Sequence, residues 1–560
     1  MLSETERTRN KTGMTEPAEL NKKPLERKTA LMLVIVLLLG GFLIFAGADW
    51  GLPVNLHPDE RTIVEPAIRL VENRSFEPDV FYRPDHLLIQ INALIYRFIV
   101  LINNIDIADM LVLGSGIYYL TARIVTGLFA MGSILMAFLI GRRYSTIIGL
   151  VAAFLFAVFP LFVTHSKYAT SDVPITFLMM LFIYFSLNYM QKPVFKNIVI
   201  MALITAAFIT IKYPGAILLV MIAVSVIVSS IIDKKYLRIL KHGIVTIVSV
   251  IFFIFLISPV LILKFNDVRS ALLFEARAEH LGADGLGMGG NMLFYVSTFL
   301  NAGGIILLVF FFFGCYALIS ERKTLYKHLP LFYGFIYWIC LSYVSLHWER
   351  WALPMYVSPL IISAIGVKKV CDMIRTSNID LRRQKIALRV FIVFLCVSAA
   401  NLVTASFGNQ LDFLMTDTRI ASQGFVEEKD INQDNTASEG YSTLKPTHGG
   451  FIFWAFKMDV DPPRIAYDNI EYLIISSYQF ERINNERNRY HGEAAFYELL
   501  HENFIEIKRF EPAKRNLTWF DPVNIIFNIS YLVRATNNGM SGPTLIYYEV
   551  SAENYYTDPH

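Results

Sequence analysis

The segment "TALMLVIVLLLGGFLIFAGA" at residues 29–48 is followed directly by "DWGLPVNLHPDE" at residues 49–60. The first stretch is long and apolar enough to cross a bilayer, because a spanning helix needs about 20 mostly apolar residues. The second stretch ends in an acidic pair, Asp59 and Glu60, close to where the chain would leave the lipid. Charges next to hydrocarbon are costly, so either local helix chemistry or a function must account for this pair.

The composition of the chain indicates a membrane protein. Of its 560 residues, 54% are hydrophobic and only 17% are charged, whereas a typical soluble protein carries about 25% charged residues. The formal net charge of +3 gives no indication of a nucleic-acid partner. The cysteines Cys315, Cys340, Cys371 and Cys396 lie in or near apolar segments. We therefore expect neither a disulfide framework nor a cysteine-ligated metal site.

Apolar segments recur along the chain and predict about eleven transmembrane helices. They cover residues 29–48, 111–140, 146–164, 172–190, 196–212, 214–232, 242–263, 292–319, 329–347, 352–367 and 386–406. Lysine and arginine concentrate in alternate short loops, for example at Arg142-Arg143, Lys234-Lys235 and Lys368-Lys369. This asymmetry indicates a cytoplasmic N-terminus. The predicted fold is an all-α polytopic membrane protein that carries a small α+β domain at its C-terminal end.

The predicted topology divides the chain into three parts. They are a cytoplasmic tail at 1–28, a transmembrane domain at 29–406 with a long extracytoplasmic loop at 49–110, and an extracytoplasmic domain at 407–560. Amphipathic patterns at 59–75 and 85–102 predict two interfacial helices within that loop. In the last domain, "EYLIISSYQF" (471–480) and "TLIYYEV" (544–550) predict strands, and "HGEAAFYELLHEN" (491–503) predicts a helix.

Further charged residues gather at the outer ends of the predicted spans. Asp172 lies in "HSKYATSDVPITF" (165–177), Lys212 in "TIKYPGA" (210–216), and Glu349 with Arg350 in "LHWERWALP" (346–354). Each has a simple structural explanation, because acids favour helix starts and long cations snorkel to the interface. Proline at the first helical position would likewise explain "PDE" as a plain helix start. A cluster of these charges that faces inward would instead form a site.

Taken together, these motifs resemble the GT-C glycosyltransferases, specifically the protein O-mannosyltransferase and aminoarabinose-transferase families. An Asp-Glu pair directly after the first span is typical of them. The resemblance covers roughly residues 30–425 and also includes "LTARIVTGL" (120–128), "IKYPG", "ERWALPMYVSPL" and "TDTRIA" (416–421). One departure is "YRPDH" (82–86), where many relatives carry prolines and apolar residues. This departure leaves the preference for donor or acceptor open.

The resemblance implies a membrane enzyme that transfers a sugar from a polyprenyl-phosphate carrier to an acceptor on the extracytoplasmic face, by an inverting single displacement. Asp59 would be the general base for the acceptor hydroxyl, with Glu60 and Asp172 assisting. Cations would hold the carrier phosphate and stabilise it as the leaving group. The candidates for this role are Lys212, Arg350, Arg123 and Arg83. His57 and Glu349 would not contact the substrate themselves but would lie next to the residues that do.

The resemblance also indicates which cofactors, partners and alternative functions to expect. We expect no required cofactor and no metal site, since the donor is a polyprenyl-phosphate sugar and no metal-ligand spacing is present. Expected partners are that lipid donor, membrane lipids, and an acceptor that is a protein, a glycolipid or a cell-wall glycan. The expected location is the plasma or inner membrane. A ligase or polymerase of lipid-linked glycans is the nearest alternative. A polytopic transporter would need paired repeats and mid-membrane charges, and a sensor or assembly protein would tolerate the loss of Asp59.

Overall fold

The computed structural model describes residues 24–277, 279–321, 324–445, 452–457, 464–467, 469–512 and 539–554. Most of the predicted cytoplasmic tail at 1–28 lies outside these residues. The chain divides into two compact units. Unit 1 comprises Met1–Asp49, His57–Ala278 and Gly285–Phe407, and unit 2 comprises Trp50–Leu56, Glu279–Asp284 and Gly408–His560. The described part of unit 1 is helical, and the β-strands belong to unit 2.

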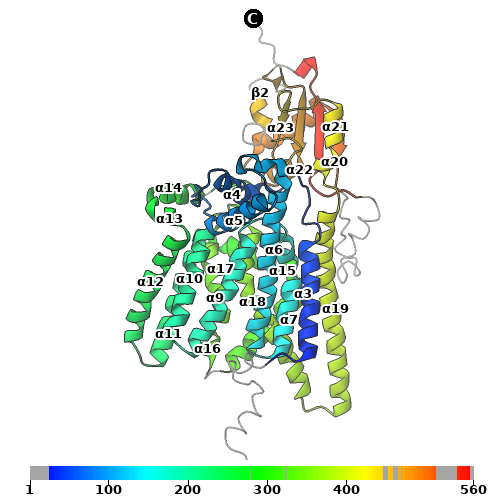
Figure 1. The fold of residues 1–560 in the computed structure, drawn as a ribbon. Helices are drawn as coiled ribbons and strands as arrows, with labels where there is room; N and C mark the ends of the chain where they lie inside the picture. Colours follow the sequence, from blue (N-terminus) through cyan, green and yellow to red (C-terminus); the bar gives the residue numbers. More distant parts are fainter. Residues whose placement is uncertain are drawn as a thin grey trace, which may run out of the picture. The chain divides into compact units, whose positions relative to one another are not determined.

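Unit 1 is a bundle of apolar helices (Figure 1). Its long helices are α3 (Arg27–Phe45), α6 (Ser115–Arg142), α7 (Thr146–Ala157), α9 (Asp172–Gln191), α10 (Phe195–Ile211), α11 (Ile217–Ile232), α12 (Leu237–Ile257), α15 (Gly287–Ser320), α17 (Tyr333–Ser342), α18 (Leu353–Arg375) and α19 (Leu381–Leu414). Short helices join them: α8 (Pro160–His165), η3 (Tyr213–Ala216), α13 (Val260–Leu263), α14 (Phe265–Glu275), α16 (Leu325–His328), η4 (Leu329–Phe332) and η5 (Glu349–Ala352).

Each of the predicted apolar segments contains one of these helices, but not all of them qualify as spans by length and composition. Within the described part of the chain, 7 helices are long and apolar enough to cross a membrane. The segment at 146–164 falls short because Pro160 separates α7 from α8. The segment at 329–347 contains only the 10-residue helix α17, and α10 has 17 residues. The prediction of about eleven spans therefore exceeds the number that meets this criterion.

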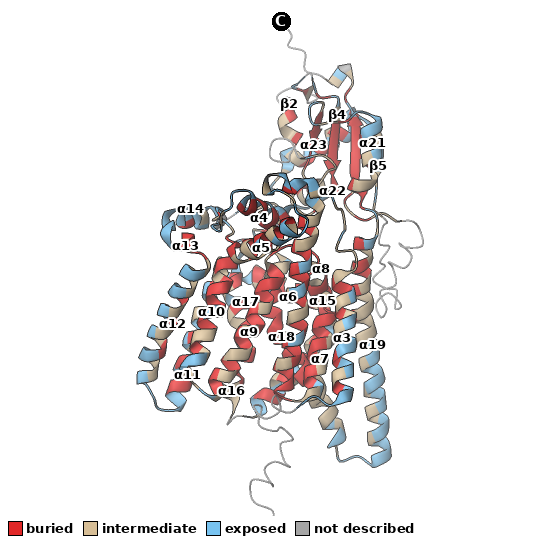
Figure 2. Cartoon of the chain, viewed as in Figure 1, coloured by how far each residue is buried: buried red, intermediate tan, exposed pale blue. Residues whose placement is uncertain are grey.

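Exposure differs strongly between the helices of the bundle (Figure 2). Most residues of α9 are buried, whereas α12 and α19 present apolar side chains to their surroundings. In α19, Ile386, Val390 and Val393 are exposed. Long exposed apolar helices have no favourable environment in water and are stable in lipid. The chain is therefore a multi-pass membrane protein.

Small residues allow α15 and α18 to pack closely. A Cβ atom on Gly314 would overlap the carbonyl oxygen of Ile362, and one on Gly366 would overlap that of Phe310. Such close backbone approach is a usual way for membrane helices to associate. Any side chain at these positions would push the two helices apart.

The predicted helices of the loop at 49–110 are present. Here η1 (Pro58–Glu60) leads into α4 (Arg61–Glu72), and α5 (His86–Ile102) and η2 (Ile107–Leu113) follow. The helix α4 buries the apolar face formed by Ile63, Val64 and Ala67. This packing fixes the orientation of η1, which carries the acidic pair.

Unit 2 contains a four-stranded sheet with the order β1-β4-β6-β5, in which only β1 and β4 are parallel. Its elements are α20 (Thr418–Ala421), α21 (Gln423–Glu428), β1 (Thr436–Ser438), η7 (Ile452–Ala455), β2 (Phe456–Lys457), β3 (Arg464–Ile465), β4 (Tyr472–Ser476), α22 (Ser477–Asn485), α23 (His491–Asn503), β5 (Ile505–Phe510), β6 (Leu545–Glu549) and η8 (Ala552–Asn554). The strands β2 and β3 form a separate antiparallel pair.

The central strands of this sheet are covered on both faces. Leu473 and Ile475 of β4 belong to one apolar cluster, which also contains residues of α22 and α23. Ile474 belongs to a second cluster with Val426 of α21. Alternate residues of a strand point to opposite faces, so β4 carries the successive apolar residues Leu473, Ile474 and Ile475. The predicted strand at 544–550 and helix at 491–503 are confirmed. The strand predicted at 471–480 ends at Ser476, directly before α22.

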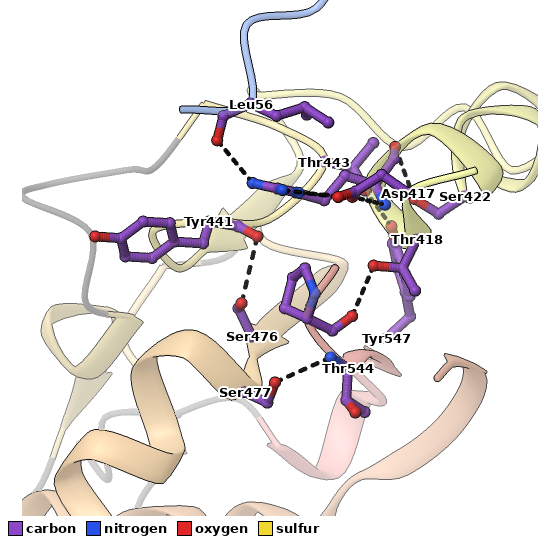
Figure 3. A network of polar contacts seen from close by, with 12 residues as sticks. Leu56, Asp417, Thr418, Ser422, Tyr441, Thr443, Ser476, Ser477, Thr544 and Tyr547 are labelled. Atoms are coloured by element: carbon purple, nitrogen blue, oxygen red, sulfur yellow. Dashed lines mark hydrogen bonds and ion pairs between the residues drawn. The ribbon is translucent and has the colours of Figure 1, made fainter. Parts of the chain in front are cut away.

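A buried polar network holds the segment Trp50–Leu56 within unit 2 (Figure 3). Asp417 accepts hydrogen bonds from Arg419 Nε at 2.8 Å and Nη2 at 2.9 Å. The Nη1 group of the same arginine donates to the carbonyl oxygen of Leu56 at 2.9 Å. Nearby, Thr418 Oγ1 donates to Pro543 O at 2.6 Å. The motif "TDTRIA" thus fixes the backbone shortly before the acidic pair.

Candidate active site

The two carboxylates of η1 point in different directions. Pro58 begins this short helix, and Thr62 Oγ1 donates to the carbonyl oxygen of Asp59 at 2.7 Å. The side chain of Asp59 remains 22% exposed, whereas Glu60 is fully buried. The residues adjacent in sequence therefore have different environments, and only Asp59 lines a cavity.

Glu60 forms a buried ion pair with Arg123 of α6. Arg123 Nε and Nη2 each donate to Glu60 at 2.8 Å, and the amide of Ala169 donates to Glu60 Oε1 at 2.9 Å. Arg123 Nη1 also donates to Ala48 O at 2.8 Å. The Glu60 and Arg123 side chains are 0% and 2% exposed, respectively. Neither residue lines the cavity described below, so Arg123 is not positioned to hold a phosphate in it, and the pair instead anchors η1 to α6.

A cavity of about 320 Å³ lies in unit 1, at the lower end of the usual range for small-molecule sites, about 300–1,000 Å³. Five charged side chains of the predicted site line it: Asp59, Arg83, Asp172, Lys212 and Arg350. Its remaining wall is largely apolar and includes Leu272, Ala276, Leu341, Val344 and Trp351. The cavity thus has a charged part and an apolar part.

The charged residues form one continuous chain of ion pairs. Arg83 Nη1 lies 3.0 Å from Asp59 Oδ1, and Arg350 Nη2 contacts Asp59 Oδ2. Arg350 Nε lies 3.5 Å from Asp172 Oδ2, and Lys212 Nζ lies 2.8 Å from Asp172 Oδ1. Arg350 therefore bridges the two carboxylates. Within this chain of ion pairs, three cations face two carboxylates.

Local backbone structure explains how these side chains converge. Asp172 is the first residue of α9, where a carboxylate is favoured by the helix dipole. Lys212 follows the last residue of α10 in extended conformation, before the turn η3. Arg350 lies in η5, which leads into α18. These three charged residues therefore converge because each lies at or next to the end of a helix.

The neighbouring cations determine the protonation state of Asp59. Burial alone would raise the pKa of this carboxyl, but the guanidinium groups of Arg350 and Arg83 outweigh it and hold the pKa well below its usual range. Asp59 is therefore ionised at neutral pH.

Asp85, a residue absent from the sequence-based candidates, also lines the cavity. Its side chain is buried and its Oδ1 atom has no hydrogen-bond partner among the described residues. Burial raises the pKa of Asp85 to about 7. The only sequence indication was the unusual "YRPDH" stretch.

The two supporting residues predicted from sequence lie outside the cavity lining. The His57 ring packs on Tyr168 with 4.1 Å between ring centroids. Burial lowers the pKa of His57 to about 3, so its imidazole is neutral at physiological pH. The side chain of Glu349 is exposed. Among the described residues, no group of three or more His, Cys, Asp or Glu side chains is arranged to hold a metal ion.

This combination of a helical membrane bundle and a charged cavity with an apolar wall defines a membrane protein with an enzyme-like site. Residues 110–263 match the family model described as dolichyl-phosphate-mannose-protein mannosyltransferase. This match includes Arg123, Asp172 and Lys212. It confirms the resemblance to GT-C enzymes and supports a membrane glycosyltransferase.

Solved structures provide further similarities. ArnT from Cupriavidus metallidurans in the apo state is 11% identical with a TM-score of 0.47, and the match covers 81% of this chain and 94% of that one. ArnT from the same organism bound to undecaprenyl phosphate is also 11% identical, with a TM-score of 0.48. That match covers 94% of this chain and 99% of ArnT. The apo oligosaccharyltransferase of Archaeoglobus fulgidus is 12% identical to this chain, with a TM-score of 0.46. This match covers 68% of the present chain but only 56% of the oligosaccharyltransferase. A comparison with curated protein sequences finds no match.

Proposed function

We propose that this protein transfers a sugar from a polyprenyl-phosphate donor to an acceptor on the extracytoplasmic side of the cell membrane. The observation that carries the proposal is the chain of ion pairs from Arg83 through Asp59, Arg350 and Asp172 to Lys212, beside an apolar wall in one cavity. Cations suit a phosphate, a carboxylate suits a hydroxyl, and the apolar wall suits an isoprenoid chain. The family model matched at 110–263 is named for a lipid-phosphate sugar donor, which agrees with this reading.

In the proposed reaction, Asp59 accepts the proton of an acceptor hydroxyl group. The acceptor oxygen forms a bond to the anomeric carbon as the bond from this carbon to the phosphate oxygen breaks. The electron pair leaves with the polyprenyl phosphate. A single displacement inverts the anomeric configuration, and a positioned base typically contributes about 10²–10⁴-fold to such a rate.

The cations would hold the donor phosphate and stabilise its charge as it leaves. Lys212 has an ammonium group with three donors, of which one is used by Asp172. Arg350 presents a planar guanidinium suited to bidentate phosphate contacts. Arg83 would act from the other side of Asp59. We propose no such role for Arg123, which is already paired with Glu60 in a buried position.

Donor binding would also activate the base. Arg350 and Arg83 keep the proton affinity of Asp59 low. A phosphate that attracts Arg350 would withdraw positive charge from this carboxylate and raise its pKa. Asp59 would then become a stronger base once the donor is bound. Asp172 would remain next to Lys212 and orient it.

The proposed mechanism needs an acceptor that carries a hydroxyl group. A protein, a glycolipid or a cell-wall glycan would each offer the hydroxyl that the mechanism needs. A ligase or polymerase of lipid-linked glycans would use the same cavity with a longer donor. The mechanism uses only side chains of this chain and the lipid donor, and we propose that no added cofactor is required.

The proposal is tested with purified protein in liposomes that contain polyprenyl phosphates carrying single radiolabelled sugars. We expect label to pass to an acceptor in added membrane extract, with equimolar release of polyprenyl phosphate and inversion at the anomeric carbon. Movement of intact labelled lipid across the bilayer without cleavage of the sugar–phosphate bond would instead identify a transporter.

A further inference from the structure

Asp85 is an N-cap residue whose side chain does not cap its helix. It precedes α5 but makes no side-chain capping hydrogen bond, although aspartate is among the residues that most often do so. Its backbone has φ 43° and ψ 14°, a left-handed conformation that aspartate tolerates better than most residues. The backbone amide donates to Ile211 O at 3.0 Å, and the carbonyl accepts from Ile89 N at 2.8 Å. The backbone is therefore fully engaged, and the side chain is not used to cap the helix.

The carboxyl group of Asp85 lines the cavity. The residue is 2% exposed, and its Oδ1 atom has no hydrogen-bond partner in the described part of the chain. Burying a polar atom without a partner costs stability. Such an atom requires an explanation, and a functional role is one of the recognised explanations. Since the atom borders a cavity of about 320 Å³, a ligand has room to approach it.

The neighbours of Asp85 indicate which ligand group would meet it. Its amide is bonded to Ile211, the residue directly before Lys212, and Lys212, Ser171 and Tyr213 line the same cavity. If Lys212 holds the donor phosphate, the sugar ring is attached to that phosphate by a single oxygen. A group beside Lys212 would then face the sugar. A carboxyl group can accept hydrogen bonds from sugar hydroxyls, and donates one when it is protonated.

We infer that Asp85 recognises a hydroxyl group of the donor sugar and so determines which sugar the protein transfers, an inference that rests on the proposed function. Asp85 is a specificity-determining residue that contacts substrate, distinct from Asp59, which takes the proton. Loss of its carboxyl group would relax sugar selection while leaving the transfer chemistry in place.

The test uses Asp85→Gly, which removes the side chain at a backbone conformation that glycine adopts freely, and Asp85→Asn, which keeps its size. Asn104→Gly is the matched control, because Asn104 is exposed and also has a positive φ of 52°. Donors are polyprenyl phosphates that carry mannose or glucose and the 2-, 3-, 4- and 6-deoxy forms of each. Transfer gives kcat/KM, and binding of sugar-free polyprenyl phosphate is measured separately.

For the wild type and the Asn104→Gly variant, we expect one deoxy donor to react about 10- to 100-fold more slowly than its parent, as for loss of a hydrogen bond to a charged group. In Asp85→Gly this difference should fall below about 3-fold, with unchanged affinity for the sugar-free lipid. Should this variant fail to fold, Asp85→Asn must show an altered order of preference among the donors. The same preference for every donor in wild type and variants would overturn the role of Asp85 alone. Absence of transfer from any donor by the wild type would instead count against the proposed function.

Discussion

At the scale of single residues, Arg350 explains how two carboxylates can coexist in one small cavity. It contacts Asp59 through Nη2 and approaches Asp172 through Nε, while Arg83 and Lys212 neutralise the outer oxygens. Like charges so close together would otherwise raise each other's pKa. Because both arginines lower its pKa, Asp59 is a weak base, and donor binding would raise its proton affinity.

Asp85 should make stability depend on pH in a defined direction. Burial raises its pKa from 3.8 to about 7, so its contribution to stability is fully present below about pH 4 and is lost as pH rises through 7. The stability difference, wild type minus Asp85→Asn, should therefore fall between these limits by at most about 1.4 kcal/mol per pH unit. Thermal melts in detergent at several pH values provide the measurement. A difference that stays constant would show that the carboxyl titrates normally.

Lys212 should contribute to binding of the donor phosphate. Replacing it by alanine removes a charge-assisted contact worth about 1.5–3 kcal/mol, so we expect the KM for the lipid donor to rise by roughly 10- to 100-fold. Lys264→Ala is the control, since Lys264 is exposed and does not line the cavity. Steady-state transfer kinetics provide the comparison. Equal KM values for both variants would mean that the phosphate binds elsewhere.

At the scale of secondary-structure elements, the Glu60–Arg123 pair joins η1 to α6. Arg123→Met leaves a buried carboxylate without its partner, which typically costs about 3–5 kcal/mol. We therefore expect a large drop in the melting temperature. Arg383→Met is the matched control, because Arg383 and its partner Asp380 are 80% and 56% exposed, and exposed pairs contribute about 1 kcal/mol or less. If both variants melt alike, the buried pair does not anchor η1.

The helices of this protein were predictable, whereas several functional contacts were not. Apolar runs located the helices, and the stretch rich in isoleucine and tyrosine at 544–550 located β6, because these patterns are local. The short elements were harder to predict: the strand at 471–480 was predicted too long because the helix α22 begins at Ser477, directly after the apolar run. Fewer helices than the predicted spans meet the criterion of length and composition, because a proline interrupts an apolar run, as at Pro160.

Only some residues of the candidate site could be predicted from the sequence. Asp59, Asp172, Lys212 and Arg350 were identified, and the structure brings them together. The inward orientation of Glu60 depends on Arg123, which is remote in sequence, so a local pattern could not reveal it. Asp85 was missed because its importance lies in a left-handed backbone and an absent partner, neither of which a sequence displays.

At the scale of the whole molecule, the proposed membrane topology is directly testable. The loop charges predict that Asn378 lies in the cytoplasm and Glu428 outside, and both residues are exposed. Single cysteines at these positions, in a background without the four native cysteines, are treated with a membrane-impermeant thiol reagent. We expect labelling of Glu428→Cys in intact cells, and of Asn378→Cys only after permeabilisation. Labelling of both in intact cells would contradict the topology.

The central claim is that Asp59 is the catalytic base, and its replacement by asparagine tests this most directly. Asp59→Asn keeps the size of the side chain but cannot accept the proton. Asp79→Asn is the matched control, since Asp79 also pairs with an arginine, Arg69, at 3.2 Å but is 69% exposed. Glu60→Gln is unsuitable as a control because Glu60 is buried in an ion pair.

Sugar transfer from a polyprenyl-phosphate donor and a melting curve are measured for wild type, Asp59→Asn and Asp79→Asn. We expect Asp59→Asn to fold and to lose about 10²–10⁴-fold in kcat, while Asp79→Asn transfers at the wild-type rate. An Asp59→Asn protein that transfers sugar as fast as the wild type would contradict the account, because the acidic pair would then serve only to begin and anchor a helix.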